Sequence, residues 1–279
     1  AAFGNVLEHL NKSEDYAFTG TIQLQKRFSN GVEFNGGYTY SEAKDVMSLT
    51  SSIAFSNYGF ATLNGLLNDR DLTTSTFSRP HRVVLSGTVD LPADFEFSLI
   101  CSGVSGSPFG YVINGDANAD GVGGTNREFN DMVYVPRDRD DISMFGATTA
   151  AQDAAYDSLA TFIADQSCLR NQRGQIMERN SCRNPWINRL DARLQKLVPT
   201  FAGQTMILSL DVFNLLNMID SDWGLVKSTS TFEGQTLVRL RGWDNLNNRG
   251  IYSLSLPIGN RVDPLASVWR IQLGGKYMW

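Results

Sequence analysis

Apolar and polar positions alternate along this sequence in a series of short segments. From Val32 to Ser41, the even positions are apolar, aromatic or glycine, and the odd positions are polar or small. The preceding segment, about Ala17 to Phe28, alternates in the same way, and Ser29-Asn30-Gly31 between them has the composition of a tight turn. The pattern predicts an antiparallel hairpin whose two faces meet different environments.

Four more segments form two further predicted hairpins. They are His81 to Leu91 with Phe95 to Ser102, joined by Pro92-Ala93-Asp94, and Arg189 to Val198 with Leu208 to Val212, joined near Pro199 to Gln204. A last alternating segment runs from Trp269 to Trp279. Its polar positions include Arg270 and Lys276, which would be costly in lipid but acceptable in a water-filled lumen. Seven strands are therefore predicted.

Long polar connections separate the hairpins, at residues 42–80, 103–188 and 215–267. Loops of this length fit a compact soluble sandwich poorly. Short turns on one side and long loops on the other are typical of outer-membrane β-barrels, whose long loops lie outside the cell. The sequence therefore predicts an all-β fold in which residues 1–279 belong to a transmembrane antiparallel β-barrel and residues 103–188 form a long extracellular loop.

The odd number of strands predicts an incomplete barrel. Bacterial single-chain barrels have an even number of strands and both ends in the periplasm. We therefore expect this chain to be the C-terminal part of a barrel that the same or another chain completes, with Trp279 as the true C-terminus. Residues 1–13 lack a signal peptide, which indicates processing or truncation. The alternative is that the last long connection contains an uncounted strand, near Thr236 to Arg241 or Gly250 to Leu256. A second uncounted strand would then be needed to keep both the strand count and the positions of the two chain ends consistent.

One short helix is predicted inside the long middle loop. Thr148 or Thr149 can cap its N-terminus. Its apolar side chains then fall on one face, namely Tyr156, Leu159, Phe162 and Ile163. We expect this helix to be a packing element of the loop.

Charge and apolar run length exclude other classes of protein. The 24 Lys and Arg residues against 29 Asp and Glu give a net charge of -5, which argues against a nucleic-acid partner and a polybasic membrane anchor. No apolar run approaches the roughly 18 to 20 residues of a transmembrane helix. Membrane-spanning strands need only about 9 to 11 residues, and every second one faces lipid, so a barrel stays compatible with this composition.

The sequence has three cysteines. Cys101 lies in an alternating segment, whereas Cys168 and Cys182 lie close together in a loop. A disulfide between Cys168 and Cys182 would suit an oxidising compartment. The alternative is two unpaired thiols.

The strongest candidate binding motif is Asp116-Ala117-Asn118-Ala119-Asp120-Gly121. Oxygen-bearing side chains at alternate positions, with Gly at the sixth, match the first half of a calcium loop. Arg127 occupies the twelfth position, so the predicted Ca²⁺ ligands are Asp116, Asn118, Asp120, Glu128 and Asp131. The alternative is an Asx-turn loop whose side chains bond their own backbone.

The sequence offers few candidate catalytic residues. His9 and His81 are its two histidines, and no nucleophile lies beside a positioned base, so we expect no enzymatic activity. Aromatic residues near strand ends predict girdles at the membrane interfaces, namely Tyr38, Tyr40, Trp269, Tyr277 and Trp279. In a soluble sandwich the same residues would form core.

Three segments together resemble the C-terminal barrel half of TonB-dependent receptors of the Oar-like type, which carry an N-terminal carboxypeptidase-regulatory-like domain. The segments are Gly106 to Phe109 with Gly115 to Gly121 and Asn130 to Pro136; Gln172 to Gly174 through Arg179-Asn180 to Cys182-Arg183-Asn184-Pro185-Trp186; and Leu210-Asp211-Val212-Phe213-Asn214-Leu215-Leu216-Asn217. The last is shared by many such receptors, whereas the segment around Arg179 is specific to the narrower group. The resemblance covers nearly the whole chain.

The resemblance implies a Gram-negative outer-membrane protein with a 22-stranded barrel, a plug, and an N-terminal segment that contacts the TonB system for energy-coupled passage of a substrate. Loops 42–80 and 103–188 would gate or bind that substrate. Tyr277 and Trp279 resemble the terminal signal that the barrel-assembly machinery recognises, with Trp279 in the place usually held by Phe. The alternative function is a surface structural or adhesion protein that uses the barrel as an anchor in outer-membrane lipid.

Overall fold

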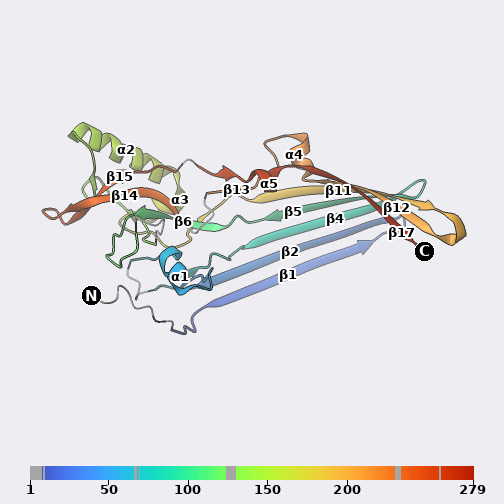
Figure 1. Ribbon diagram of the computed structural model, residues 1–279, viewed down its shortest axis with the longest axis horizontal. Coiled ribbons are helices and arrows are strands. Elements are labelled where there is room, and N and C mark those ends of the chain that lie inside the picture. Colours follow the sequence, from blue (N-terminus) through green and yellow to red (C-terminus); the bar gives the residue numbers. More distant parts are fainter. Residues whose placement is uncertain are drawn as a thin grey trace.

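The structure is a computed structural model that describes residues 8, 10–65, 68, 70–123, 130–229, 234–257 and 259–279. It has two parts, which follow one another along the long axis of the molecule (Figure 1). One part is a sheet of long strands, with the short turns and the C-terminus at its right-hand end in the figure. The other part, at the opposite end, is a folded cap made from the long connections.

The long sheet contains a strand at each of the seven predicted segments. In spatial order these strands are β1 (Tyr16–Arg27), β2 (Val32–Asp45), β4 (His81–Leu91), β5 (Phe95–Val104), β11 (Ile187–Pro199), β12 (Thr205–Phe213) and β17 (Arg270–Met278). A short strand, β3 (Thr73–Thr74), extends the pairing of β2. The sheet is antiparallel throughout and open, because β1 and β17 are its two edges and the described residues contain no pairing between them. A closed barrel is therefore not formed by these strands alone.

The connections expected to be polar loops contain helices and strands, most of which form the cap. The helices are α1 (Ala54–Phe60), α2 (Thr149–Asp165), α3 (Ser167–Arg170), α4 (Leu215–Ile219) and α5 (Pro264–Ser267). Of these, α4 and α5 lie along β11 of the long sheet (Figure 1). The strands are β6 (Pro108–Asn114), β7 (Tyr134–Val135), β8 (Ser143–Met144), β9 (Gln175–Ile176), β10 (Cys182–Arg183), β13 (Lys227–Ser228), β14 (Gly234–Asp244), β15 (Arg249–Leu254) and β16 (Arg261–Val262). A 3-10 turn, η1 (Phe201–Gly203), lies instead between β11 and β12.

The predicted helix is confirmed as α2, but the expectation of one helix is wrong, since four shorter ones accompany it. The Thr148 hydroxyl accepts a hydrogen bond from the Ala151 amide and so caps α2, as predicted. Tyr156, Leu159 and Ile163 are the buried residues of this helix. The shorter helices escaped prediction because segments of four to seven residues are too short to show a helical period.

No helix in the described part of the chain has both the length and the apolar character needed to cross a membrane.

The two segments considered as uncounted strands are strands of the cap, β14 and β15. They pair with each other, β14 pairs with β6, and β15 pairs with β8, so the cap sheet has the order β10-β6-β14-β15-β8. Neither segment joins the long sheet. The middle connection supplies β6, β8 and β10, and the last connection supplies β14 and β15, so the cap sheet joins parts of the chain that are far apart in sequence.

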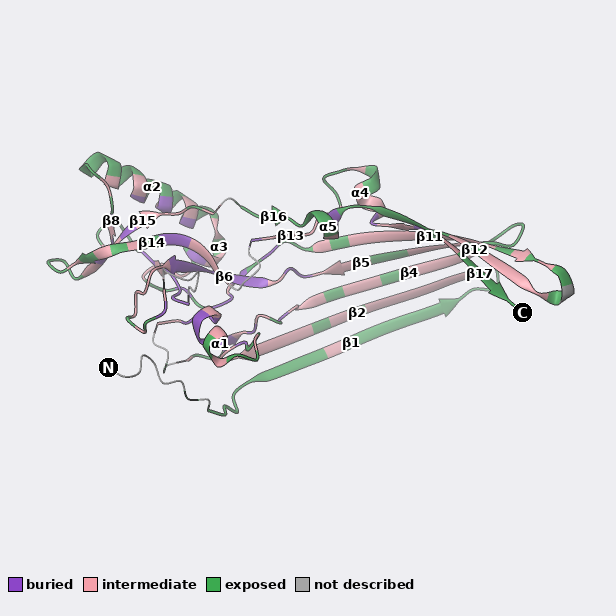
Figure 2. Cartoon of the chain, in the orientation of Figure 1, coloured by how far each residue is buried: buried purple, intermediate pink, exposed green. Residues whose placement is uncertain are grey.

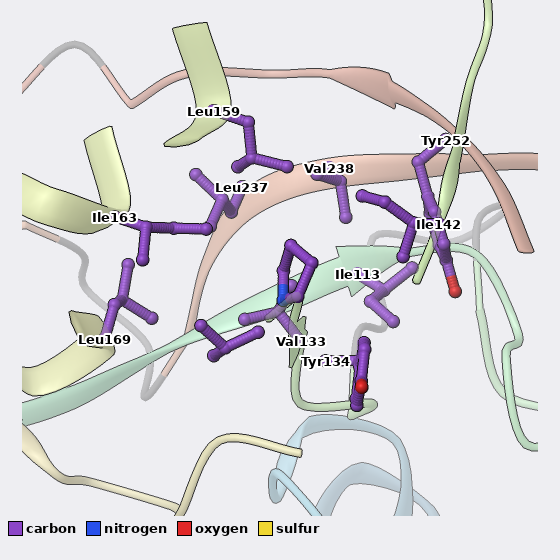
Figure 3. A pocket seen from close by; sticks show the side chains of 12 residues that line it. Ile113, Val133, Tyr134, Ile142, Leu159, Ile163, Leu169, Leu237, Val238 and Tyr252 are labelled. Carbon is purple, nitrogen blue, oxygen red and sulfur yellow. The ribbon is translucent and has the colours of Figure 1, made fainter. Parts of the chain in front are cut away.

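The apolar core of the chain lies in the cap. Most buried segments gather there, whereas the long strands are mainly intermediate or exposed (Figure 2). Leu159 and Ile163 of α2 pack toward Leu237 and Val238 of β14 (Figure 3). The void between the core side chains measures about 10 Å³, roughly enough for one water molecule. The side chains of this core therefore leave little empty space between them.

Residues 179–186, called the tie segment below, hold the cap together. Asn180 donates hydrogen bonds to the Thr74 carbonyl (2.9 Å) and the Thr76 hydroxyl (3.0 Å), both in the first connection. The Asn184 side-chain oxygen accepts a hydrogen bond from the Thr229 amide (2.8 Å) in the last connection. The middle connection, which contains the tie segment, is thus bonded to the other two.

Arg179 makes several buried polar contacts. Its side chain is 3% exposed and forms an ion pair with Asp45 at the end of β2. The guanidinium also donates to the Ser48 hydroxyl (3.0 Å) and the Thr73 hydroxyl (3.1 Å). A buried guanidinium with this many acceptors is well satisfied, and its removal would leave the partly buried Asp45 carboxylate without its counter-charge.

We predict that Arg179→Met loosens the cap without unfolding the long sheet. Loss of one partner of a buried ion pair typically costs about 3–5 kcal/mol. Hydrogen exchange measured by mass spectrometry should therefore become faster in β6 and β14, while β4 and β5 keep the wild-type rates.

Arg137→Ala is the matched control, because Arg137 pairs with Asp141 while its own side chain is 67% exposed. Exposed pairs contribute about 0–1 kcal/mol, so exchange in β6 and β14 should change little. The double variant Arg179→Met with Asp45→Asn should recover part of the lost protection, since no unpaired charge remains. Equal exchange in Arg179→Met and Arg137→Ala would contradict the assigned role of Arg179.

Candidate functional site

The long sheet has one face that is apolar along its whole width. The strand registers align most of the apolar residues of neighbouring strands on this apolar face. It carries Phe18, Ile22, Leu24, Phe34, Tyr38, Tyr40, Val83, Leu85, Val89, Phe97, Leu99, Cys101, Leu190, Ala192, Leu194, Leu208, Leu210, Val212, Ile271, Leu273 and Tyr277. Ile22 is 75% exposed and Leu273 is 80% exposed, so no described part of the chain covers them. An apolar face of this kind requires an apolar surrounding.

Aromatic and basic side chains lie at the two ends of the apolar face. At the cap end, the His81 ring stacks on Trp186 with centroids 6.0 Å apart, and the Tyr38 hydroxyl is 2.8 Å from His81 Nδ1. At the turn end, Lys196 lies over the Phe95 ring, with its ammonium nitrogen 4.7 Å from the centroid. Amphipathic side chains above and below an apolar band are typical of membrane interfaces. The contribution of His81 and Trp186 was missed, since neither shows a periodic signal on its own.

The opposite face of the long sheet is polar and internally bonded. The Thr21 and Thr39 hydroxyls lie 3.0 Å apart across β1 and β2, and Thr88 and Ser98 make the same contact, also 3.0 Å, across β4 and β5. Arg193 of β11 pairs with the buried carboxylate of Asp211 of β12. Cross-strand polar contacts of this kind suit a water-filled lumen.

The predicted calcium loop forms a network of Asx-type hydrogen bonds. The Asp120 amide donates to Asp116 Oδ1 (3.1 Å) and to Asn118 Oδ1 (2.9 Å). The Gly121 amide donates to Asp116 Oδ2 (3.0 Å), and the Val122 amide to Asp120 Oδ1 (2.8 Å). These are the contacts of the Asx-turn alternative, and a calcium ion would have to compete with the backbone amides for the same oxygens.

The remaining predicted calcium ligands are Asp131 and Glu128. Asp131 is 3% exposed, its Oδ2 accepts a hydrogen bond from the Ala117 amide (2.6 Å), and burial raises the pKa of its carboxyl to about 6. Glu128 lies outside the described residues. Within the described ranges, no three or more His, Cys, Asp or Glu side chains are grouped so as to hold a metal ion. Calcium binding therefore stays a prediction.

The predicted disulfide is present. Cys168 and Cys182 are bonded, with their Cα atoms 5.2 Å apart, and they connect α3 to β10. Cys182 is buried against the apolar core of the cap. The disulfide therefore links the tie segment covalently to α3 and holds these two parts of the cap together.

The terminal aromatic residues lie at the turn end of the sheet. Tyr277 is on the apolar face of β17 and donates a hydrogen bond to the Gln204 side chain. Trp279 follows β17 and is 94% exposed. Both side chains are thus accessible at an edge strand, next to the C-terminus (Figure 1).

A family model described as an outer membrane beta barrel domain matches residues 11–232. The matched residues include the six long strands from β1 to β12 and most of the cap. Comparison with curated proteins and with solved structures finds no match.

The assignment of faces predicts how cysteines respond to thiol reagents. Cys101 is the free cysteine of the chain and lies exposed on the apolar face, whereas its neighbour Ser102 lies on the polar face. In intact outer membranes, a charged methanethiosulfonate should fail to label Cys101, because lipid covers it. The variant Cys101→Ser with Ser102→Cys should be labelled.

Both proteins should be labelled after unfolding in detergent and urea, which controls for the reactivity of each thiol. A lipid-soluble maleimide should label Cys101 in the membrane. Labelling of Cys101 by the charged reagent before unfolding would contradict the assignment of the apolar face to lipid.

The calcium prediction is tested by hydrogen exchange of residues 115–123 with and without calcium. If Ca²⁺ binds, it should slow exchange in this loop, and Asp120→Asn should remove the effect because it removes a charged ligand. The Asx-turn alternative predicts the same exchange rates at every calcium concentration. Asp153→Asn in α2 is the matched control, since it changes the charge equally at a site outside the loop.

Proposed function

This chain belongs to the outer membrane beta barrel domain family, and from that premise we propose that it forms the C-terminal part of a TonB-dependent receptor of the Oar-like type. Its location is the outer membrane of a Gram-negative bacterium, and its apolar face contacts membrane lipid. The proposed activity is energy-coupled passage of a substrate through a larger barrel. The observation that carries the proposal is an open sheet with one lipid-compatible and one polar face.

The open edges support a barrel larger than this sheet. The outer backbone groups of β1 and β17 have no strand partner in the described residues. In the apolar core of a membrane each unsatisfied backbone group costs several kcal/mol, so lipid-exposed sheet edges do not occur there. Further strands, from the same protein or from another chain, must therefore pair with both edges. The 22-stranded barrel of the resembling family would accommodate these seven strands as about a third of its wall.

The polar face supports an aqueous interior. The Arg193–Asp211 pair and the cross-strand hydroxyl contacts lie on the side opposite to lipid. A lumen lined in this way can hold a plug or a polar substrate. The cap lies at the end of the sheet away from the short turns, where it would stand above the lumen on the extracellular side (Figure 1).

The family-like segments support the narrower assignment by what they do in the fold. In the Leu210 to Asn217 segment, Asp211 pairs with Arg193, and Asn214 donates hydrogen bonds to the Gly224 carbonyl (3.0 Å) and the Ser267 carbonyl (2.6 Å). Asn214 thus holds two distant parts of the last connection together next to the end of β12. The tie segment bonds the middle connection to the other two, so the residues that carry the resemblance have defined structural roles.

The exposed terminal aromatic supports assembly by the barrel-assembly machinery. Tyr277 and Trp279 lie at the end of edge strand β17, whose outer side has no partner strand in the described residues and is accessible to a strand of an assembling partner. The proposed partners are thus the assembly machinery during folding, the TonB system through a segment outside these residues, and a plug within the completed barrel.

We predict the composition of the particle purified from outer membranes. An affinity tag inserted after Leu246, which is 96% exposed between β14 and β15, should allow purification without disturbing the sheet. Electron cryomicroscopy of this particle should show a closed barrel in which β1 and β17 each pair with another strand, and a plug inside it. The periplasmic domain of TonB should bind the particle.

Two outcomes separate the proposal from its alternatives. A closed barrel built from copies of this chain alone would refute the receptor. A completed barrel without a plug, which does not bind TonB, would instead favour the surface structural or adhesion function. A tag at the same position in Arg179→Met serves as a control, because loss of cap order should leave the pairing of β1 and β17 unchanged.

A further inference from the structure

The cap contains a second cavity, which adjoins the void in its apolar core and shares Ile113, Tyr134, Ile142 and Tyr252 with its wall. This pocket has a volume of about 260 Å³, just below the range of typical small-molecule sites. Its wall combines residues of β14 and β15 with residues that follow the Asx-turn loop. The side chains that matter for the argument are Asp131, Tyr134, Asp141, Trp243, Arg249 and Tyr252.

Two of the three charged groups in the wall are already neutralised. Asp141 pairs with Arg137 (2.9 Å) and accepts a hydrogen bond from the Tyr134 hydroxyl (2.9 Å). Hydrogen bonds from Arg137 hold the pKa of Asp141 well below its usual range, so it stays ionised and paired. Arg249 lies 3.6 Å from Asp244 and donates to the Asp140 carbonyl (2.6 Å).

Asp131 differs from both, because no Lys or Arg among the described residues forms an ion pair with it. Its Oδ2 accepts a hydrogen bond from the Ala117 amide, and the Asn118 backbone amide also stabilises the carboxylate. Its Oδ1 is buried with no partner within hydrogen-bond distance in the described part of the chain. The pKa of the Tyr252 hydroxyl is raised first by burial and second by the negative charge of Asp131. The Asp131 carboxylate therefore acts electrostatically on the aromatic side of the pocket. A buried carboxylate without a counter-charge is costly, and a cation in the adjacent pocket would relieve that cost.

The rest of the wall is aromatic and apolar. Tyr134 and Tyr252 lie with Ile113 and Ile142 at one end of the cap core, away from α2 (Figure 3). Trp243 is half exposed and also lines the pocket. Aromatic faces attract cations within about 6 Å, and the apolar residues suit a hydrocarbon body.

We propose that this pocket binds an organic cation, an ammonium or guanidinium group carried on an apolar body of roughly the size of one amino-acid side chain. The cation lies near Asp131 and the aromatic rings, and the hydrocarbon part lies against Ile113 and Ile142. A bare divalent cation fits this wall less well, since it needs several oxygen ligands at once. As a recognition step at the cell surface, this binding deepens the proposed receptor function and rests on it for the later passage of the ligand.

The test is isothermal titration calorimetry of the complete, detergent-solubilised protein with phenethylamine, and with 2-phenylethanol as the uncharged probe. Phenethylamine should bind at least tenfold more tightly than 2-phenylethanol. Asp131→Asn should abolish that preference, because it removes the charge but keeps an oxygen that can accept the Ala117 hydrogen bond. Asp153→Asn, which removes a carboxylate in α2, should bind phenethylamine like the wild type.

Trp243→Ala provides a second variant that does not alter the buried network. It should weaken phenethylamine binding severalfold while hydrogen exchange of the cap stays unchanged. Equal affinity for the two probes, or full retention of the preference in Asp131→Asn, would overturn the proposal, as would displacement of phenethylamine by calcium at equimolar concentration. Because titration measures binding without transport, it fails or succeeds independently of the plug and TonB experiment.

Discussion

The buried contact between Arg179 and Asp45 is the interaction on which the arrangement of this chain depends. It joins the middle connection to the end of β2, and Asn180 and Asn184 extend it to the first and last connections. A buried ion pair contributes little net stability compared with an apolar pair of the same volume, but it is costly to break. Its effect is therefore selective. Of the many ways in which three long loops could pack, it favours the one that brings Arg179 to its acceptors.

The chain buries its apolar side chains in two opposite ways. In the long sheet, antiparallel register sends them outward to lipid and leaves polar groups inside. In the cap, the same residue types point inward and are shielded from water, as Leu159 and Leu237 show. On the extracellular side proposed for it, the cap would meet water on its outside and would need its own core, and the Cys168–Cys182 bond adds a cross-link suited to an oxidising compartment. The stacked rings of His81 and Trp186 lie where the sheet with outward-facing apolar residues meets the cap with inward-facing ones.

Sequence reasoning reached those features that depend on neighbouring residues. Period-two alternation located the long strands, and a capping threonine with apolar residues on one face located α2. The parallel pairing of β6 with β14 was out of reach, because it joins Gly110 to Gly234 and nothing local in either segment specifies the other. Arg179 was noticed as part of a family-like segment, but its partner Asp45 lies far away along the chain. For the loop from Asp116 to Gly121, the sequence could not distinguish a calcium site from an Asx-turn, because the same side-chain oxygens can bind a metal ion or accept hydrogen bonds from backbone amides.

The two parts also differ in what they need from outside the chain. The cap satisfies its core and most of its buried polar groups internally, whereas the long sheet needs lipid on one face and strands at both edges. Completion of the barrel would therefore act on the sheet, and it would affect the cap through the attachments of the cap to β2 and β11. Those attachments include Asp45 to Arg179, Asp191 to the Asn214 amide and Arg189 to the Ala266 carbonyl, and each begins at a residue of the long sheet. These contacts connect the cap, and the pocket within it, to the strands of the long sheet. The proposed receptor function needs such a connection, because it would link binding in the cap to events in the barrel.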